Sequence, residues 1–90
     1  MEFEWDRDKA KSNAAKHDVT FNEAMTVFND PAAYTFHDPD HSFDEDRYLV
    51  FGYSNRSRLL TVIYTYREKK TRIISARRVT TGEQEIYAEA

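Results

Sequence analysis

The 90-residue sequence contains no cysteine, only two glycines and two prolines, and no long apolar run. Without cysteine the chain forms neither a disulfide framework nor a thiolate metal site, and a reducing compartment is expected. No stretch reaches the roughly 18 apolar residues of a membrane span, and residues 1–5 lack the apolar core of a signal peptide. These absences predict a soluble cytoplasmic protein, and the length predicts one domain over residues 1–90.

Charge is distributed unevenly along the chain. The formal net charge is −3, yet residues 56–78 hold eight Lys and Arg side chains against one glutamate, a balance of +7. Residues 31–46 hold five acids and no Lys or Arg. This asymmetry indicates that the second half of the chain presents a basic surface to a polyanion. The acidic part is expected to cover that surface or to repel the polyanion. The alternative is that the Lys and Arg side chains only solvate exposed faces of the strands.

Local patterns predict elements in the order βααββββα. Residues 2–5 alternate as a short strand, and Asp6 caps a helix that ends near His17. The capping box of Thr20 and Glu23 starts a second helix, which a proline at position 31 ends. The later elements are strands at 33–37, 47–53, 58–66 and 71–78 and a helix opened by Thr80 and Glu83. Short links imply hairpins, so the fold class is α+β, an antiparallel sheet with two N-terminal helices and one C-terminal helix.

The last strand ends in two consecutive arginines. Strict alternation assigns Ile73, Ser75 and Arg77 to one face of the sheet and Arg78 to the other. Strand positions two residues apart lie ~7 Å apart, about the spacing of successive phosphates, and guanidinium forks match phosphate oxygens. The hydroxyl beside Arg77 favours a functional role for that arginine. Arg78 suits phosphate binding and an ion pair with a glutamate of the next helix equally well.

Titratable side chains elsewhere suit proton transfer. His41, Glu45 and Arg47 supply an imidazole, a carboxylate and a cation, a set that fits proton transfer beside a phosphate. His17 beside Lys16 at a helix end is a second candidate, and its alternative role is a cap that interacts with the helix dipole. The acidic loop that contains His41 lacks a calcium-loop glycine and paired histidines at helical spacing, so no metal site is predicted. No Gly-rich phosphate loop or nucleophile elbow is present, which argues against nucleotide triphosphate hydrolysis and acyl transfer.

A pattern of residues runs in order along nearly the whole chain. Its first part consists of Phe3-Glu4-Trp5-Asp6, Lys9, Asn13, Lys16-His17, Val19, Phe21, Glu23-Ala24, Phe28 and Asp30-Pro31. Its second part consists of His41-Ser42, Glu45, Arg47, Gly52, Arg58-Leu59-Leu60, Val62, Tyr64-Thr65, the run from Arg72 to Arg78, Thr80, Glu83 or Glu85, and Tyr87. This pattern resembles the BrnT toxin family. One departure is Asp18, where the family often has glycine, and it affects only the local turn.

The resemblance implies a RelE-like ribonuclease fold and the function of a type II toxin, which cleaves RNA and arrests translation. It also implies a BrnA-type antitoxin, in a heterotetramer that binds operator DNA through the antitoxin. RNA carries its own 2′-hydroxyl nucleophile, so a metal-independent enzyme without cofactor needs only a base, an acid and cations. The catalytic candidates are Arg77, Arg78, Arg47, His41 and His17. The candidates for RNA binding are Lys16, Arg58, Arg67 and Arg72.

Two other classes of function remain open from the sequence. The first is a non-catalytic RNA- or ribosome-binding module, which binds RNA without cleaving it. The second is a protein-interaction module without nuclease activity. Tyr53, Tyr66 and Tyr87 are candidates for stacking on unpaired bases, with core packing as the alternative for each.

Overall fold

The structure, a computed structural model, describes residues 1–41 and 44–89, and of His41 only the backbone. Its strands are β1 (Phe3–Glu4), β2 (Tyr34–Asp38), β3 (Arg47–Tyr53), β4 (Leu59–Arg67) and β5 (Lys70–Arg78). Its helices are α1 (Arg7–His17), α2 (Phe21–Thr26) and α3 (Thr81–Glu89), with single 3-10 turns η1 (Val27–Asn29) and η2 (Pro39–His41). Within the described ranges, no helix is long and apolar enough to cross a membrane.

The capping residues begin and end the helices as the sequence predicts. The Asp6 side chain accepts a hydrogen bond from the first turn of α1 at 3.0 Å, and Asp18 ends this helix in the left-handed region at φ 57°. The Thr20 hydroxyl accepts the N–H of Glu23 at 3.1 Å. The reciprocal half of this capping box does not form, because the carboxylate of Glu23 binds Arg58 instead.

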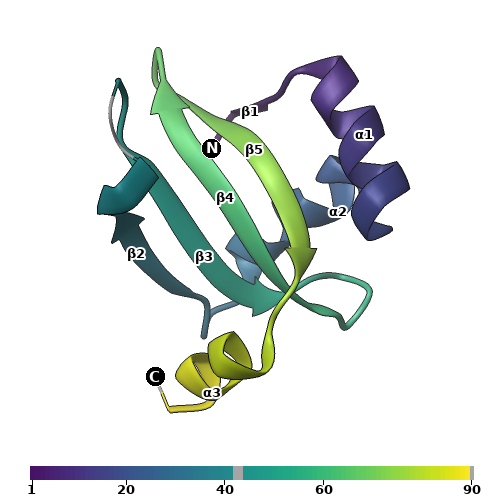
Figure 1. Cartoon of the computed structure of the whole chain (residues 1–90), viewed down its shortest axis with the longest axis vertical. Helices are drawn as coiled ribbons and strands as arrows, with labels where there is room; N and C mark the ends of the chain where they lie inside the picture. The colour runs from purple at the N-terminus through teal and green to yellow at the C-terminus, as the bar shows by residue number, and fades with distance from the viewer. Residues whose placement is uncertain (42–43, 90) are drawn as a thin grey trace.

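The five strands form one sheet in the order β1-β5-β4-β3-β2 (Figure 1). Strands β2 to β5 are antiparallel neighbours, as the short links predict, but β1 runs parallel to β5, with Phe3 opposite Thr71. The prediction of a purely antiparallel sheet is therefore wrong, and the sheet is mixed. A parallel pair needs a long crossover, and here residues 5–69 lie between the two strands, so no local link signals the pairing.

Strand β5 carries a register irregularity that strict alternation does not anticipate. Ile63 lies opposite Ser75, whereas the next residue of β4, Tyr64, lies opposite Ile73. An extra residue of this kind shifts the faces of a strand, so Ile73 and Ala76 both belong to the buried core. The prediction that Ile73 shares a face with Ser75 and Arg77 is wrong for this reason.

The two faces of the sheet are covered differently. Helices α1 and α2 and the turn η1 pack on one face and bury the main core there (Figure 1). On the other face, the register places Thr61 opposite Arg77 and Ile63 opposite Ser75. Helix α3 lies at one end of that face, where the Thr61 hydroxyl donates to Glu83 at 2.9 Å. The rest of this face carries no helix among the described elements.

Candidate functional site

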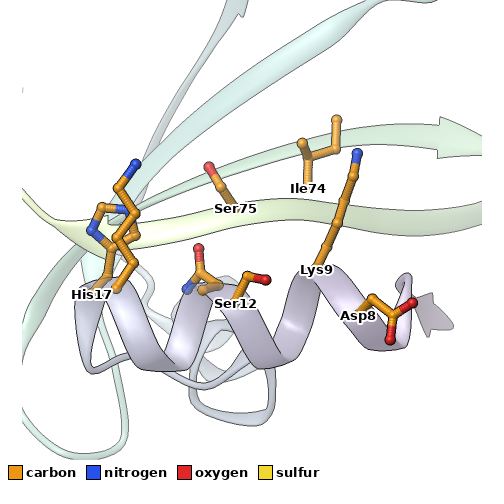
Figure 2. Close-up of a pocket in the computed structure, with 8 residues that line it drawn as sticks. Asp8, Lys9, Ser12, His17, Ile74 and Ser75 are labelled. Atoms are coloured by element: carbon orange, nitrogen blue, oxygen red, sulfur yellow. The ribbon is translucent and has the colours of Figure 1, made fainter.

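An open groove of about 330 Å³ runs between α1 and β5 (Figure 2). Strand β1 pairs with β5 only at Thr71 and Arg72, so the remaining edge of β5 is left for α1. We call this cavity the α1–β5 groove. Its lining residues are Asp8, Lys9, Ser12, Asn13, Lys16, His17, Ile74 and Ser75.

Asn13 fastens α1 to the edge of β5. Its Nδ2 atom donates to the carbonyl oxygens of Ala76 at 2.8 Å and Val19 at 2.9 Å, and its Oδ1 atom accepts the N–H of Ala76 at 3.1 Å. The residue is only 7% exposed, and an unpaired polar backbone there would be costly. Helical spacing puts Lys9 and Lys16 on the face of Asn13, so these contacts align both lysines with the groove.

Basic side chains outnumber acidic ones in the lining of the α1–β5 groove. Lys9 and Lys16 are exposed and form no salt bridge with any described residue. Figure 2 shows Lys9 and His17 rising from α1 toward β5 at opposite ends of the groove, with Ser12 between them. His17 is the last residue of α1 and lines the same groove as the two lysines. Two ammonium groups and an imidazole against the single carboxylate of Asp8 make this groove suitable for an anion.

Arg77 extends this surface along β5. It follows Ser75 by two residues on the same face, which separates the two positions by ~7 Å. Its guanidinium is half-buried and donates to both carboxylate oxygens of Glu83 on α3, at 2.7 and 2.8 Å. Desolvation opposes ionisation, yet hydrogen bonds led by the one from Arg77 lower the pKa of Glu83 to about 2. The sequence left Arg78 as the possible anchor of the last helix, but the described ion pair belongs to Arg77, and Arg78 is exposed.

The three arginines predicted to bind RNA all form ion pairs in the structure. Arg58 is only 11% exposed, and its Nε donates to Glu23 at 2.9 Å, so this pair fixes α2 to the turn between β3 and β4. The remaining pairs are Arg67 with Glu45 at 3.0 Å and Arg72 with Glu4 at 2.8 Å. None of these three guanidiniums lines the α1–β5 groove. Lys16 is the one predicted RNA-binding residue that does.

The proposed set of His41, Glu45 and Arg47 is only partly described. The side chain of His41 lies outside the described residues. Glu45 is engaged with Arg67, and Arg47 begins β3 opposite Thr65, where it has an interaction partner. Among the described residues, no group of three His, Asp or Glu side chains is placed to hold a metal ion. His17 is therefore the described imidazole that lies beside free cations.

Sequence reasoning did not select Lys9, Ser12 or Glu83 as site residues. Lys9 carried a signal, because it shares a helical face with Asn13 and Lys16. Ser12 had no signal, since a polar residue on an exposed helix is common. Glu83 was predicted to form a capping box with Thr80 and was, with Glu85, a possible partner of Arg78. The capping box does form, with two reciprocal hydrogen bonds of 2.9 and 3.2 Å, but the arginine that Glu83 binds is Arg77.

Comparison with known proteins places the chain in a family. A family model described as the ribonuclease toxin, BrnT, of type II toxin-antitoxin system matches residues 5–83. The crystal structure of the Brucella abortus ribonuclease toxin, BrnT, superposes with a TM-score of 0.68 at 23% identity, covering 90% of this chain and 99% of that chain. The curated protein sequences contain no match. The structural likeness shows a shared fold, and the family model spans most of the sequence, so the chain belongs to the BrnT family of ribonuclease toxins of type II toxin–antitoxin systems.

Proposed function

We propose that this chain is a metal-independent endoribonuclease that cleaves RNA in the α1–β5 groove, with Arg77 extending the phosphate-binding surface. The observation that carries the proposal is the pair of lysines without salt bridges, Lys9 and Lys16, which line the same groove as His17 and the hydroxyls of Ser12 and Ser75. Free cations contribute more to phosphate binding than cations that are already paired, because no partner has to be displaced.

The chemistry needs only groups that this chain and the RNA provide. The 2′-oxygen of the RNA attacks the adjacent phosphorus, the bond to the 5′-oxygen breaks, and the products carry a 2′,3′-cyclic phosphate and a 5′-hydroxyl. His17 accepts the proton of the 2′-hydroxyl, and Lys16 protonates the leaving 5′-oxygen. Arg77 stabilises the extra negative charge of the phosphorane. Lys9, at the other end of the groove, binds a neighbouring phosphate of the RNA.

The ion pair between Arg77 and Glu83 fits this proposal. A carboxylate and a phosphate offer a guanidinium the same arrangement of two acceptor oxygens. Glu83 therefore occupies the two guanidinium donors of Arg77 that a phosphate of the RNA would bind. When the substrate binds, the phosphate replaces the carboxylate on Arg77. The carboxylate of Glu83 also accepts hydrogen bonds from the Thr61 hydroxyl and the N–H of Thr80, so it keeps these two partners when Arg77 binds the phosphate.

The test is cleavage of a labelled single-stranded RNA by the purified chain in the presence of EDTA. We expect fragments with 2′,3′-cyclic phosphate and 5′-hydroxyl ends, formed at the same rate with and without the chelator. RNA that is bound in a salt-sensitive way but stays intact would favour the non-catalytic binding module. A chain with no affinity for RNA would favour the protein-interaction module.

We infer that the partner is a BrnA-type antitoxin and that the two chains form a heterotetramer, which binds operator DNA through the antitoxin. The support is the type II toxin–antitoxin description of the matching family. The proposal includes a RelE-like fold, action as one domain of 90 residues, and a cytoplasmic site of action, where translated RNA lies. Co-expression with the neighbouring gene is expected to relieve growth arrest, and the mass of the purified complex tests its stoichiometry.

A further inference from the structure

We infer a second RNA contact, a subsite for one unpaired nucleobase, in the open pocket where α2, η1 and the end of β3 meet. This pocket measures about 520 Å³, and we call it the base pocket. It rests on the proposed function, because it assigns a place to the RNA beyond the scissile phosphate. Its lining residues are Thr26, Asn29, Asp30, Tyr53, Ser54 and Asn55.

The aromatic ring of the base pocket is exposed and held in place. Tyr53 is 46% exposed, and its ring meets the ring of Tyr87 edge-on, with centroids 5.5 Å apart and an interplanar angle of 80°. Asp30 fixes both residues, since its Oδ2 accepts the backbone N–H of Tyr53 at 2.8 Å and the hydroxyl of Tyr87 at 2.9 Å. A ring that is fixed before binding loses little freedom when a base stacks on it, which favours stacking of an unpaired base.

Amide side chains lie beside this ring. The side chain of Asn29 makes no hydrogen bond with any described residue. Asn55 is positioned by the Thr26 hydroxyl, which accepts the backbone N–H of Asn55 at 2.8 Å and contacts its Oδ1 at 3.4 Å. The free amide of Asn29 presents a donor and an acceptor side by side, which matches the N6 and N7 edge of adenine. The base pocket therefore favours adenine over pyrimidines.

Helix α3 connects the base pocket to the proposed cleavage site. Glu83 binds Arg77, and Tyr87 one turn later contacts Tyr53. Neighbouring positions four residues apart on a helix lie about 6 Å apart, so Arg77 and Tyr53 are separated by on the order of 15 Å. An RNA strand bound at Arg77 can span this distance with a few nucleotides. Arg56, next to Asn55, has a side chain that is 65% exposed although it lies 3.7 Å from Glu23, and it provides a further cation for the RNA backbone.

The test measures binding separately from cleavage. Amide NMR spectra of the chain are recorded with AMP, with CMP, and with short oligonucleotides whose 2′-hydroxyls are methylated, so that no nucleophile is present. We expect AMP to shift the resonances of Asn29, Tyr53 and Asn55 more than CMP does. An adenine-containing oligonucleotide is expected to bind at least tenfold more tightly than AMP, because it adds phosphate contacts. Equal affinities for AMP and the oligonucleotide would overturn the RNA assignment in favour of a free nucleotide.

Variants separate stacking from a merely structural role. Tyr53→Ala is expected to weaken oligonucleotide binding between about fivefold and a hundredfold, the usual effect of removing one stacked aromatic. Tyr66→Ala removes another exposed tyrosine, 55% exposed on β4, and leaves affinity unchanged. Tyr87→Phe keeps the ring but loses its bond to Asp30, and is expected to keep at least half of the affinity. Equal losses in the Tyr53 and Tyr66 variants would overturn the base pocket. Base binding without any cleavage of RNA would instead contradict the proposed ribonuclease activity and leave the base pocket supported.

Discussion

Asn13 illustrates what can be known about a single residue from the sequence. Helical spacing put it on one polar face with Lys9 and Lys16, and the structure places all three along the α1–β5 groove. Spacing does not reveal that Asn13 turns inward to bind the backbone of Ala76, which lies 63 residues away in the sequence. A long-range hydrogen bond of this kind leaves no trace in local periodicity.

Replacing Asn13 tests this positional role. Asn13→Ala leaves the N–H and C=O of Ala76 and the C=O of Val19 without their partner, so we expect a loss of about 2–4 kcal/mol in the free energy of unfolding. Urea unfolding followed by the fluorescence of Trp5, the one tryptophan, measures this loss. The matched control is Ser12→Ala, which is expected to stay within about 0.5 kcal/mol of wild type. Equal stabilities of the two variants would contradict the role of Asn13.

At the scale of elements, local signals predicted the helices and hairpins well. Asp6, Thr20 and Thr80 cap the three helices, and the strand predicted from position 47 to 53 has those bounds in the structure. The parallel pairing of β1 with β5 and the irregularity in β5 were not predictable in this way. The parallel pairing joins two segments that lie far apart in the sequence. The irregularity comes from an extra residue in β5, which a strict two-residue period does not anticipate.

The docking of α3 is expected to depend on pH. The pKa of Glu83 falls from its ordinary value of 4.5 to about 2 in the folded protein, so ionised Glu83 stabilises the docked helix above pH 4.5. This contribution is lost as the pH falls from 4.5 toward 2. The protection factors of the α3 amides, which compare each exchange rate with that of an unfolded chain at the same pH, are therefore expected to fall as the pH falls across this window in wild type. Glu83→Gln should show low protection factors that change little with pH, and a wild-type-like profile in this variant would contradict the assignment.

At the scale of the whole molecule, the uneven charge agrees with membership of a ribonuclease family, but it does not reveal which cations lack salt bridges. The basic half of the chain contains most of the arginines, yet five of them form ion pairs with glutamates elsewhere in the sequence. These pairs are Arg56 and Arg58 with Glu23, Arg67 with Glu45, Arg72 with Glu4 and Arg77 with Glu83. The cations without salt bridges in the α1–β5 groove are lysines of α1. Composition cannot reveal such pairing, because it depends on the fold.

We propose that RNA is cleaved beside the face of β5 that carries Ser75 and Arg77. The most direct measurement is the single-turnover cleavage rate of one labelled RNA by wild type, Arg77→Ala, Arg78→Ala and Glu83→Gln. We expect Arg77→Ala to lose about 10²–10³ in rate, the usual effect of removing one charge donor. Arg78→Ala is expected to stay within about threefold of wild type, since phosphate contacts outside the site affect mainly binding. Glu83→Gln, which loosens α3 but keeps Arg77, should cleave at least as fast as wild type. A fully active Arg77→Ala, or an equal loss in Glu83→Gln, would contradict the claim.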